Sequence, residues 1–118
     1  MIHRSKAPLR IGLAGGGTDV SPYCDQFGGA ILNATISLNA YATIEIIEGD
    51  KIIVEAVDRD EKEVYDWQTI LPINGQLDLL KGVYNRIQKD YPFEKRGFNL
   101  STYVDAPPGS GLGSSSTL

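Results

Sequence analysis

The sequence predicts a domain of the α+β class. Several segments alternate apolar and polar residues, as half-buried strands do, and one segment repeats apolar residues at helical spacing. A glycine-rich turn follows the last strand-like segment and runs into four consecutive hydroxyl residues. With 118 residues, of which 42% are hydrophobic, the chain is long enough to build one core but hardly two.

The first half of the chain is expected to form strands. Residues 2–13 have the pattern of an opening strand, and Pro8, which has no N–H, fits there only at a sheet edge or a bulge. Residues 40–48 alternate in character, and Gly49-Asp50 then predicts a hairpin turn into a strand over residues 51–57. These two strands are therefore expected to be antiparallel neighbours.

The second half is expected to contain one helix and another strand. Residues 58–67 mix acidic and aromatic side chains, which indicates a surface loop or strand edge with Trp67 as a core or rim packing residue. An apolar stripe over about residues 76–89 predicts an amphipathic helix that Pro92 ends. The stripe consists of Leu77, Leu80, Val83, Tyr84 and Ile87. Residues 98–104 then alternate as a strand that leads into the glycine-rich turn.

Composition and charge exclude several classes of function. The formal net charge is −4 and the 11 Lys and Arg residues are scattered, which argues against a nucleic-acid partner. The single cysteine, Cys24, permits no internal disulfide, indicates a reducing compartment and is expected to be a small buried thiol. No apolar run reaches membrane-spanning length and the start lacks the apolar core of a signal peptide. We therefore expect a cytoplasmic protein with no membrane partner; the oligomeric state stays open.

The glycine-rich turn over residues 105–117 has the features of a phosphate-binding loop. Gly109, Gly111 and Gly113 allow positive φ values, so that successive N–H groups converge on an anion. A helix that starts near Gly113 would point its N-terminus at the same anion. Hydroxyls at residues 114–116 can donate to phosphate oxygens or offer a lone pair to a phosphate-bound Mg²⁺. The alternative is a flexible Gly/Ser linker, against which Leu112 and the preceding proline pair argue.

Two common phosphate motifs are excluded by residue type. No lysine follows the last glycine, as a P-loop requires, and position 114 is serine where the dinucleotide fingerprint has glycine. The pattern that remains, P-x-G-x-G-L-G-S-S from Pro107, resembles the nucleotide-binding motif of the GHMP kinase superfamily, which includes galactokinase, homoserine kinase and mevalonate kinase. The resemblance implies ATP as cofactor, with Mg²⁺ on Ser114. The residues that it assigns to ATP are Pro108, Gly109, Ser110, Gly111, Leu112, Gly113, Ser114 and Ser115.

A second glycine cluster, over residues 7–19, resembles the first motif of the same superfamily, A-P-G-R-x-N-L-x-G-E-H-T-D. The matching positions are Pro8, Arg10, Leu13, Gly15, Thr18 and Asp19. The resemblance implies that Arg10 is a catalytic residue beside the phosphoryl-accepting hydroxyl. It also implies that Gly16, Gly17, Thr18 and Asp19 bind the substrate, with Asp19 accepting hydrogen bonds from sugar hydroxyls. Taken alone, Asp19 could equally be an Asx-turn or helix cap, and Arg10 a surface ion pair.

The departures from the superfamily motif point to one branch. Gly16 and Gly17 replace the usual glutamate and histidine, which leaves room for a substrate larger than a hexose. The motif has the form A-P-L-R-I-G-L-A-G-G-G-T-D and is followed by Pro22-Tyr23 and by residues 28–34. This version most closely resembles the D-glycero-D-manno-heptose 7-phosphate kinases. That branch phosphorylates the anomeric hydroxyl in nucleotide-activated heptose biosynthesis. Bacterial fucokinases share L-A-G-G-x-T-D, so a fucokinase-like or galactokinase-like hexose 1-kinase stays an alternative, as does a non-catalytic sugar- or nucleotide-binding module.

The resemblance also implies a fold and a domain organisation. Superfamily members have a ribosomal-protein-S5-domain-2-like N-terminal domain, with a mixed or antiparallel sheet and helices on one side, followed by a ferredoxin-like domain. Residues 1–118 are therefore expected to be a truncated N-terminal ATP-binding domain, inactive alone, with the catalytic aspartate and the metal-binding glutamate lying beyond residue 118. An RNA-binding module, which an S5-like fold also allows, conflicts with the acidic charge.

Overall fold

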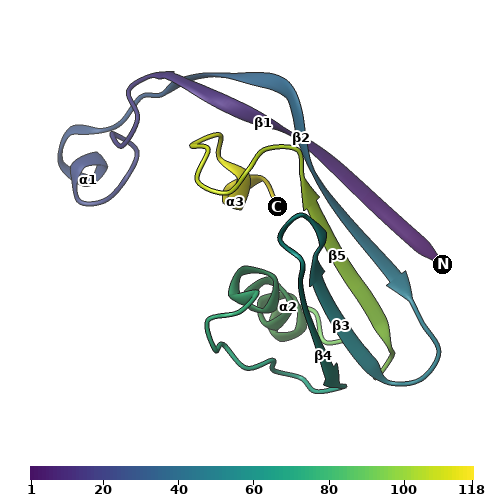
Figure 1. Cartoon of the computed structure of the whole chain (residues 1–118). Coiled ribbons are helices and arrows are strands. Elements are labelled where there is room, and N and C mark those ends of the chain that lie inside the picture. Colours follow the sequence, from purple (N-terminus) through teal and green to yellow (C-terminus); the bar gives the residue numbers. More distant parts are fainter.

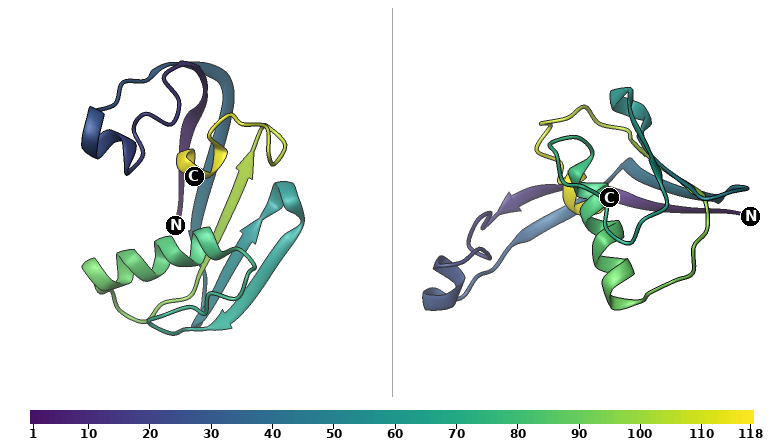
Figure 2. Two further views of the ribbon diagram at one scale, coloured as in Figure 1. Left: turned by 90° about the vertical axis from the view of Figure 1, so that its left-hand side faces the viewer. Right: turned by 90° about the horizontal axis from the view of Figure 1, so that it is seen from below.

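One sheet of five strands organises the molecule (Figure 1). The computed structural model describes residues 1–118, apart from the side chain of Ser115. The strands are β1 (Ile2–Ala14), β2 (Leu32–Ile46), β3 (Lys51–Ala56), β4 (Glu61–Asp66) and β5 (Phe98–Val104). The helices are α1 (Tyr23–Phe27), α2 (Asp78–Asp90), α3 (Ser114–Thr117) and a 3₁₀ turn, η1 (Val57–Arg59). Both α2 and α3 lie on the same face of the sheet (Figure 2), as expected for this α+β arrangement.

The order of the strands is β1-β2-β5-β3-β4, and the predicted hairpin between β2 and β3 is wrong. Strand β5 lies between them, antiparallel to β2 and parallel to β3. The turn at Gly49 instead contacts Gly97, the residue before β5: the N–H of Gly97 donates to the carbonyl of Gly49, with N and O 2.9 Å apart. Residues 49–50 have the turn chemistry of a hairpin, but a strand that follows about 50 residues later along the chain takes the central place.

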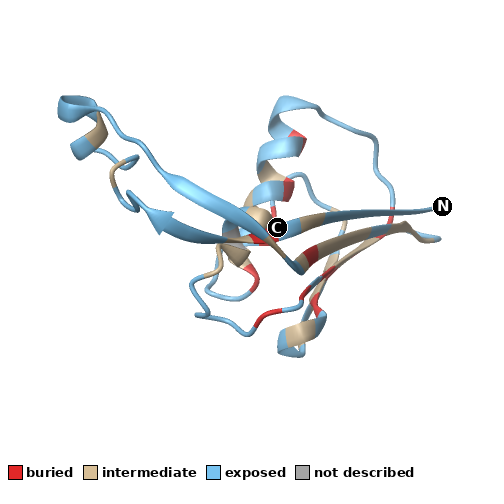
Figure 3. Ribbon diagram, turned by 90° about the horizontal axis from the view of Figure 1, so that it is seen from above, coloured by how far each residue is buried: buried red, intermediate tan, exposed pale blue. Residues whose placement is uncertain are grey.

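Strands β1 and β2 extend past the rest of the sheet as a two-stranded arm, which we define as residues 11–34. The arm has no buried residue, and α1 lies at its tip (Figure 3). Strand β2 begins at Leu32, earlier than the alternation at residues 40–48 predicts, because its first part pairs with β1 in the arm. The register of this pair shifts between Pro8 and Arg10, on an edge strand, which confirms the expected position of Pro8.

The main core forms where α2 covers β3, β4 and β5. Its buried members are Ile52, Val54, Ala56, Leu71, Leu77, Leu80, Tyr84 and Phe98, and Trp67 packs at its margin as expected. The predicted helix is confirmed, but its stripe is rotated: Val83 and Ile87 are 44% and 48% exposed, whereas Lys81 and Gln88 are buried. The reason is an ion pair of 2.8 Å between Lys81 and Glu63, which draws this side of the helix onto β4.

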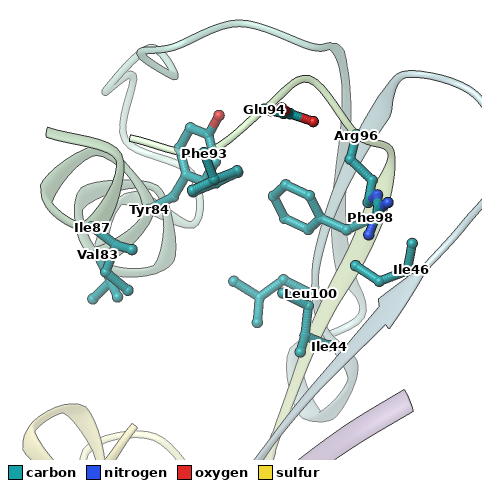
Figure 4. A pocket seen from close by; sticks show the side chains of 10 residues that line it. All are labelled: Ile44, Ile46, Val83, Tyr84, Ile87, Phe93, Glu94, Arg96, Phe98 and Leu100. Atoms are coloured by element: carbon teal, nitrogen blue, oxygen red, sulfur yellow. The ribbon is translucent and has the colours of Figure 1, made fainter. Parts of the chain in front are cut away.

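The rotation of α2 leaves an apolar cavity between the helix and the sheet. Figure 4 shows Val83 and Ile87 on α2 on one side of it and side chains of β2 and β5 on the other. The cavity measures about 570 Å³, and Phe93 and Phe98 also line it. No residue of either glycine cluster lies in its wall. Among the described helices, none is long and apolar enough to cross a membrane.

Candidate functional site

The backbone of residues 107–113, the glycine loop, has the conformation that a phosphate cradle needs. Gly109, Gly111 and Gly113 have φ values of +77°, +72° and +73°, in the left-handed region that L side chains rarely adopt. A Cβ atom at Gly109 or Gly111 would meet nothing within 4 Å, so that the loop is open to a ligand. Alternation of left-handed residues with ordinary ones is the backbone pattern of anion-binding concavities. The N–H of Ser110 closes the turn by donating to the Pro107 carbonyl at 3.2 Å.

A small second core holds this loop in place. The side chain of Leu112 packs against buried Leu9, Ala40, Val104 and Ala106. The backbone N–H of Arg10 on β1 also donates to the carbonyl of Leu112, at 3.2 Å. The loop is therefore fixed to β1 by both packing and a hydrogen bond.

Arg10 brings the two glycine clusters of the sequence together. Its guanidinium donates to Ser116 Oγ at 2.9 Å, and a Cβ atom built on Gly113 would lie 3.1 Å from the guanidinium carbon. Within the described part of the chain, Arg10 forms no ion pair, so the surface ion-pair interpretation is not supported. A permanent positive charge thus lies against the glycine loop.

The hydroxyls that follow the loop divide into two groups. Ser116 Oγ and Thr117 Oγ1 both lie within hydrogen-bond distance of the Gly113 carbonyl, at 3.0 and 2.8 Å, and so stabilise the first turn of α3. Ser114 is half-buried and lines a cavity beside the loop, where its hydroxyl can meet a ligand. The side chain of Ser115 lies outside the described part of the structure.

The cavity beside Ser114, which we call the side cavity, was missed by sequence reasoning. It measures about 380 Å³ and lies between the glycine loop, η1 and the start of α2. Its lining includes Asp58, Arg59, Leu77, Leu79, Pro108 and Ser114. No local pattern could have revealed it, because residues from three distant segments form the wall and Leu77 adopts a left-handed conformation (φ +50°) that only the surrounding fold imposes.

The carboxylate of Asp78, at the edge of the side cavity, is held in its ionised form. Its oxygens accept hydrogen bonds from the backbone N–H of Asn74 at 3.1 Å and of Gly75 at 2.9 Å. Burial acts to raise the pKa of Asp78, but these two bonds and the contact with Lys81 outweigh it and leave the pKa below its ordinary value. The wall of the side cavity therefore presents a negative acceptor group.

The second glycine cluster lies in the arm, and its backbone is tightly braced there. A Cβ atom on Gly15 would lie 1.9 Å from the Ala30 carbonyl oxygen, so only glycine permits this approach. Thr18 Oγ1 accepts from the N–H of Ala30 at 3.1 Å and lies 2.7 Å from the Gly15 carbonyl, to which it can donate. The Thr18 hydroxyl thus joins the two sides of the arm and fixes the backbone next to Asp19.

Asp19 itself is exposed and does not cap α1. The N-cap residue of that helix is Pro22, with no side-chain capping bond, and the Asx-turn or cap interpretation finds no support in the described contacts. Gly16 and Gly17 are exposed, and a Cβ atom on either would meet nothing within 4 Å. Residues 16, 17 and 19 are therefore open to solvent, in the arm that extends past the glycine loop in Figure 1.

Cys24, expected to be buried, is only half-buried, because α1 lies at the tip of the arm away from both cores.

Among the described residues, no group of three or more His, Cys, Asp or Glu side chains is placed to hold a metal ion. The assignment of Mg²⁺ to the hydroxyl of Ser114, the first choice among the loop serines, therefore stays a prediction.

Known proteins resemble this chain both in sequence and in fold. Residues 78–118 match the model of the GHMP kinases N terminal domain. The chain is 49% identical, over 98% of its length, to D-glycero-alpha-D-manno-heptose 7-phosphate kinase of Campylobacter jejuni, of which it covers 34%. It is 26% identical, over 96% of its length, to the L-fucokinase/L-fucose-1-P guanylyltransferase of Bacteroides fragilis, of which it covers 14%.

A crystal structure agrees with the arrangement of the elements. That structure, of a D-glycero-D-manno-heptose 1-phosphate kinase from Bacteroides thetaiotaomicron, superposes with a TM-score of 0.90 at 55% identity. The match covers 98% of this chain and 38% of that chain. This chain therefore spans about a third of the length of the heptose kinases that it matches.

Proposed function

We infer that the chain belongs to the GHMP kinases, because residues 78–118 match the model of their N-terminal domain and the chain is highly similar to a heptose 7-phosphate kinase. We propose that the protein containing it is an ATP-dependent sugar kinase. Its substrate would be D-glycero-D-manno-heptose 7-phosphate, phosphorylated on the anomeric C1 hydroxyl. The observation that carries the proposal is the contact of Arg10 with Ser116 and Gly113. It joins the segment that resembles a sugar motif to the loop that resembles a nucleotide motif.

The glycine loop and the side cavity fit the two parts of a nucleotide. The open backbone at Gly109 and Gly111 suits a chain of phosphates. Without side chains at these two positions, phosphate oxygens can approach the backbone closely and accept hydrogen bonds from its N–H groups. The side cavity adjoins the loop at Pro108 and Ser114 and is of a size to take a nucleoside. Its acidic wall offers acceptors for ribose hydroxyls or an exocyclic amine. When bound, ATP supplies the phosphoryl group, and Mg²⁺ neutralises part of its charge.

Arg10 would then act on the charge of the moving phosphoryl group. A guanidinium that is already held by Ser116 needs little reorganisation when negative charge develops beside the loop. Its fork of donors can bind phosphate oxygens while one N–H keeps its bond to Ser116. We assign Arg10 a catalytic role on this basis.

The exposed segment over residues 16–19 would hold the sugar. The carboxylate of Asp19 can accept hydrogen bonds from two neighbouring sugar hydroxyls, and Gly16 and Gly17 leave space for a seven-carbon substrate. Thr18 keeps Asp19 in place through its bonds across the arm. Ser114 is the one residue of this chain that we assign to Mg²⁺; we assign the base and the acidic metal ligand to the part of the protein that this chain does not span.

Steady-state kinetics of the full-length protein test the proposal. With ATP and Mg²⁺, heptose 7-phosphate should give a higher kcat/KM than L-fucose or D-galactose, and ³¹P NMR should show the new phosphate on C1. The weaker similarity to L-fucokinase favours a hexose 1-kinase as the second candidate. Equal or better turnover of fucose or galactose would select that candidate. Saturable binding of sugar and ATP with no ADP formed would instead identify a non-catalytic module.

A further inference from the structure

A pair of aromatic side chains on α1 has no role in either core. The rings of Tyr23 and Phe27 lie with their centroids 5.2 Å apart at an interplanar angle of 48°. They are 50% and 72% exposed, and α1 contains no buried residue. Packing within this chain therefore does not account for two large apolar rings side by side at the tip of the arm.

The two rings line the same hollow as the proposed sugar segment. This hollow measures about 470 Å³, and Thr18, Tyr23, Phe27 and residues 28–30 form its wall. A Cβ atom on Gly29, which lines the hollow, would lie 3.0 Å from Asp19 Cα, so that the backbone of Asp19 packs against this part of the wall. The hollow thus combines two aromatic rings with backbone polar groups of residues 28–30, and Asp19 follows Thr18 of its wall directly in the sequence.

Hydrogen bonds fix the rings relative to Asp19. Helix α1 is connected to the preceding segment by the bond from Cys24 N to Val20 O at 3.2 Å, and Ser21 Oγ donates to the carboxylate of Asp25. The helix closes with the bond from Gly28 N to Cys24 O at 3.0 Å. Because Thr18 ties the same segment to Ala30, the rings and the carboxylate belong to one braced unit.

We propose that Tyr23 and Phe27 form an aromatic platform on which the C–H face of the sugar ring stacks while Asp19 binds its hydroxyls. A pyranose presents several C–H groups on one face, and the negative face of an aromatic ring attracts such polarised hydrogens. A small-molecule site usually combines apolar surface with a few placed polar groups, and this hollow offers both. This inference rests on the proposed sugar-kinase function and names the element that recognises the ring of its substrate.

The test compares Tyr23→Leu, Phe27→Leu and the conservative Tyr23→Phe in the full-length protein. Kinetics with heptose 7-phosphate, fucose and galactose, each against ATP, are measured together with sugar binding by calorimetry without nucleotide. We expect each leucine variant to raise the KM and Kd of the sugar by about three- to tenfold. The KM of ATP should stay within twofold of the wild type, and Tyr23→Phe should retain wild-type sugar affinity, since its ring is kept.

The outcomes separate the platform from the function itself. If the wild type prefers a hexose, the choice of heptose is wrong, but the platform is still tested with that hexose. A sugar KM that is unchanged in both leucine variants would overturn the platform while leaving the kinase function intact. A lowered Tm of the full-length protein with an unchanged sugar KM would show that the rings pack against another part of the protein. A wild type that binds none of the three sugars would overturn both.

Discussion

Arg10 is the residue on which most of the proposed chemistry depends. Arg10→Ala would remove the positive charge beside the proposed phosphate cradle. It would also remove the hydrogen bond from the guanidinium to Ser116 Oγ. Loss of one preorganised electrostatic group of this kind lowers kcat by about 10²–10³-fold. We expect such a loss in the full-length protein, with Arg10→Lys intermediate because lysine keeps the charge but not the fork.

The matched control is Arg4→Ala, at the other end of β1. The side chain of Arg4 is exposed and donates to Thr43 Oγ1 at 3.1 Å, far from the glycine loop along the strand. Steady-state kinetics should give near wild-type kcat for this variant. An Arg10→Ala enzyme with kcat similar to that of Arg4→Ala would remove Arg10 from the mechanism.

Gly111 is the residue whose backbone makes the cradle possible. Its φ of +72° is strained for any L side chain, and β-branching makes the strain larger. Gly111→Val should therefore raise the Kd of ATP by about tenfold or more, since about 1–2 kcal/mol of backbone strain acts directly on the loop. Titration with ATP would measure this. Gly82→Ala, in the middle of α2, is the control and should leave the Kd unchanged; equal affinities in both variants would contradict the proposed cradle.

At the scale of elements, α2 and β4 are held together by a buried ion-pair network. Lys81 is fully buried, and its ammonium contacts Glu63 at 2.8 Å, Asp78 at 3.3 Å and Asn74 Oδ1 at 2.5 Å. Burial acts to raise the pKa of Glu63, but hydrogen bonds from Lys81, Tyr65 and Asn74 outweigh it and leave the pKa below its ordinary 4.5. The network fixes the rotation of α2 and the wall of the side cavity.

Breaking this network should destabilise the fold in a pH-dependent way. Lys81→Met would leave the largely buried Glu63 carboxylate without its cationic partner, at a cost of up to about 3 kcal/mol in the free energy of unfolding at pH 7, because Asn74 and Tyr65 still hydrogen-bond it. Because the folded pKa of Glu63 lies below the unfolded one, its contribution is complete above pH 4.5 and is lost as the pH falls through the folded value. Urea unfolding between pH 7 and pH 3 measures both effects.

The exposed Lys89 on the same helix provides the control for this measurement. Lys89→Met should change the free energy of unfolding by no more than about 0.5 kcal/mol. Glu63→Gln should make the decline in stability below pH 4.5 smaller, because one titrating group is gone while Asp78 still titrates. A wild-type profile that is equally flat would show that the network does not favour the ionised carboxylate.

The elements also show which parts of the fold local sequence can predict. Strand β5 and helix α2 were predicted to within about two residues, because alternation and apolar spacing are local properties. The β2–β3 hairpin was wrong, since the insertion of β5 between them depends on pairing between distant segments. The rotation of α2 was missed for a similar reason: burial of Lys81 requires Glu63 from β4, which no helical pattern contains.

In the candidate site, too, the contiguous motifs could be predicted, whereas the contacts between distant segments could not. The glycine loop and the segment of Asp19 were predicted as contiguous motifs, and their roles remain proposals. What the sequence did not contain is the contact of Arg10 with Ser116, which joins residues 106 positions apart, or the side cavity, whose lining comes from three segments. Motifs could therefore be recognised in the sequence, whereas their mutual placement depends on the fold.

At the scale of the whole molecule, the isolated chain exposes much apolar surface. The cavity below α2 has a volume of about 570 Å³, and Val83 and Ile87 at its rim are nearly half exposed. Exposed apolar clefts of this size bind hydrophobic dyes. The 118-residue chain should therefore enhance ANS fluorescence strongly, and Val83→Ser combined with Ile87→Ser should weaken the signal several-fold. Val64→Ser on the edge strand β4 is the control, and equal signals from both variants would place the dye elsewhere.

Strand β1 carries Arg10 in its middle and leads into the sugar segment at its end. Strand β1 thus carries the sugar segment and also contacts the glycine loop, and a shift of the arm on sugar binding would act on the loop through Arg10 N and its bond to Leu112. Ligand arrival at one end would then alter affinity at the other, and thermodynamic reciprocity requires the same factor in both directions. Such heterotropic cooperativity would be transmitted along a single strand.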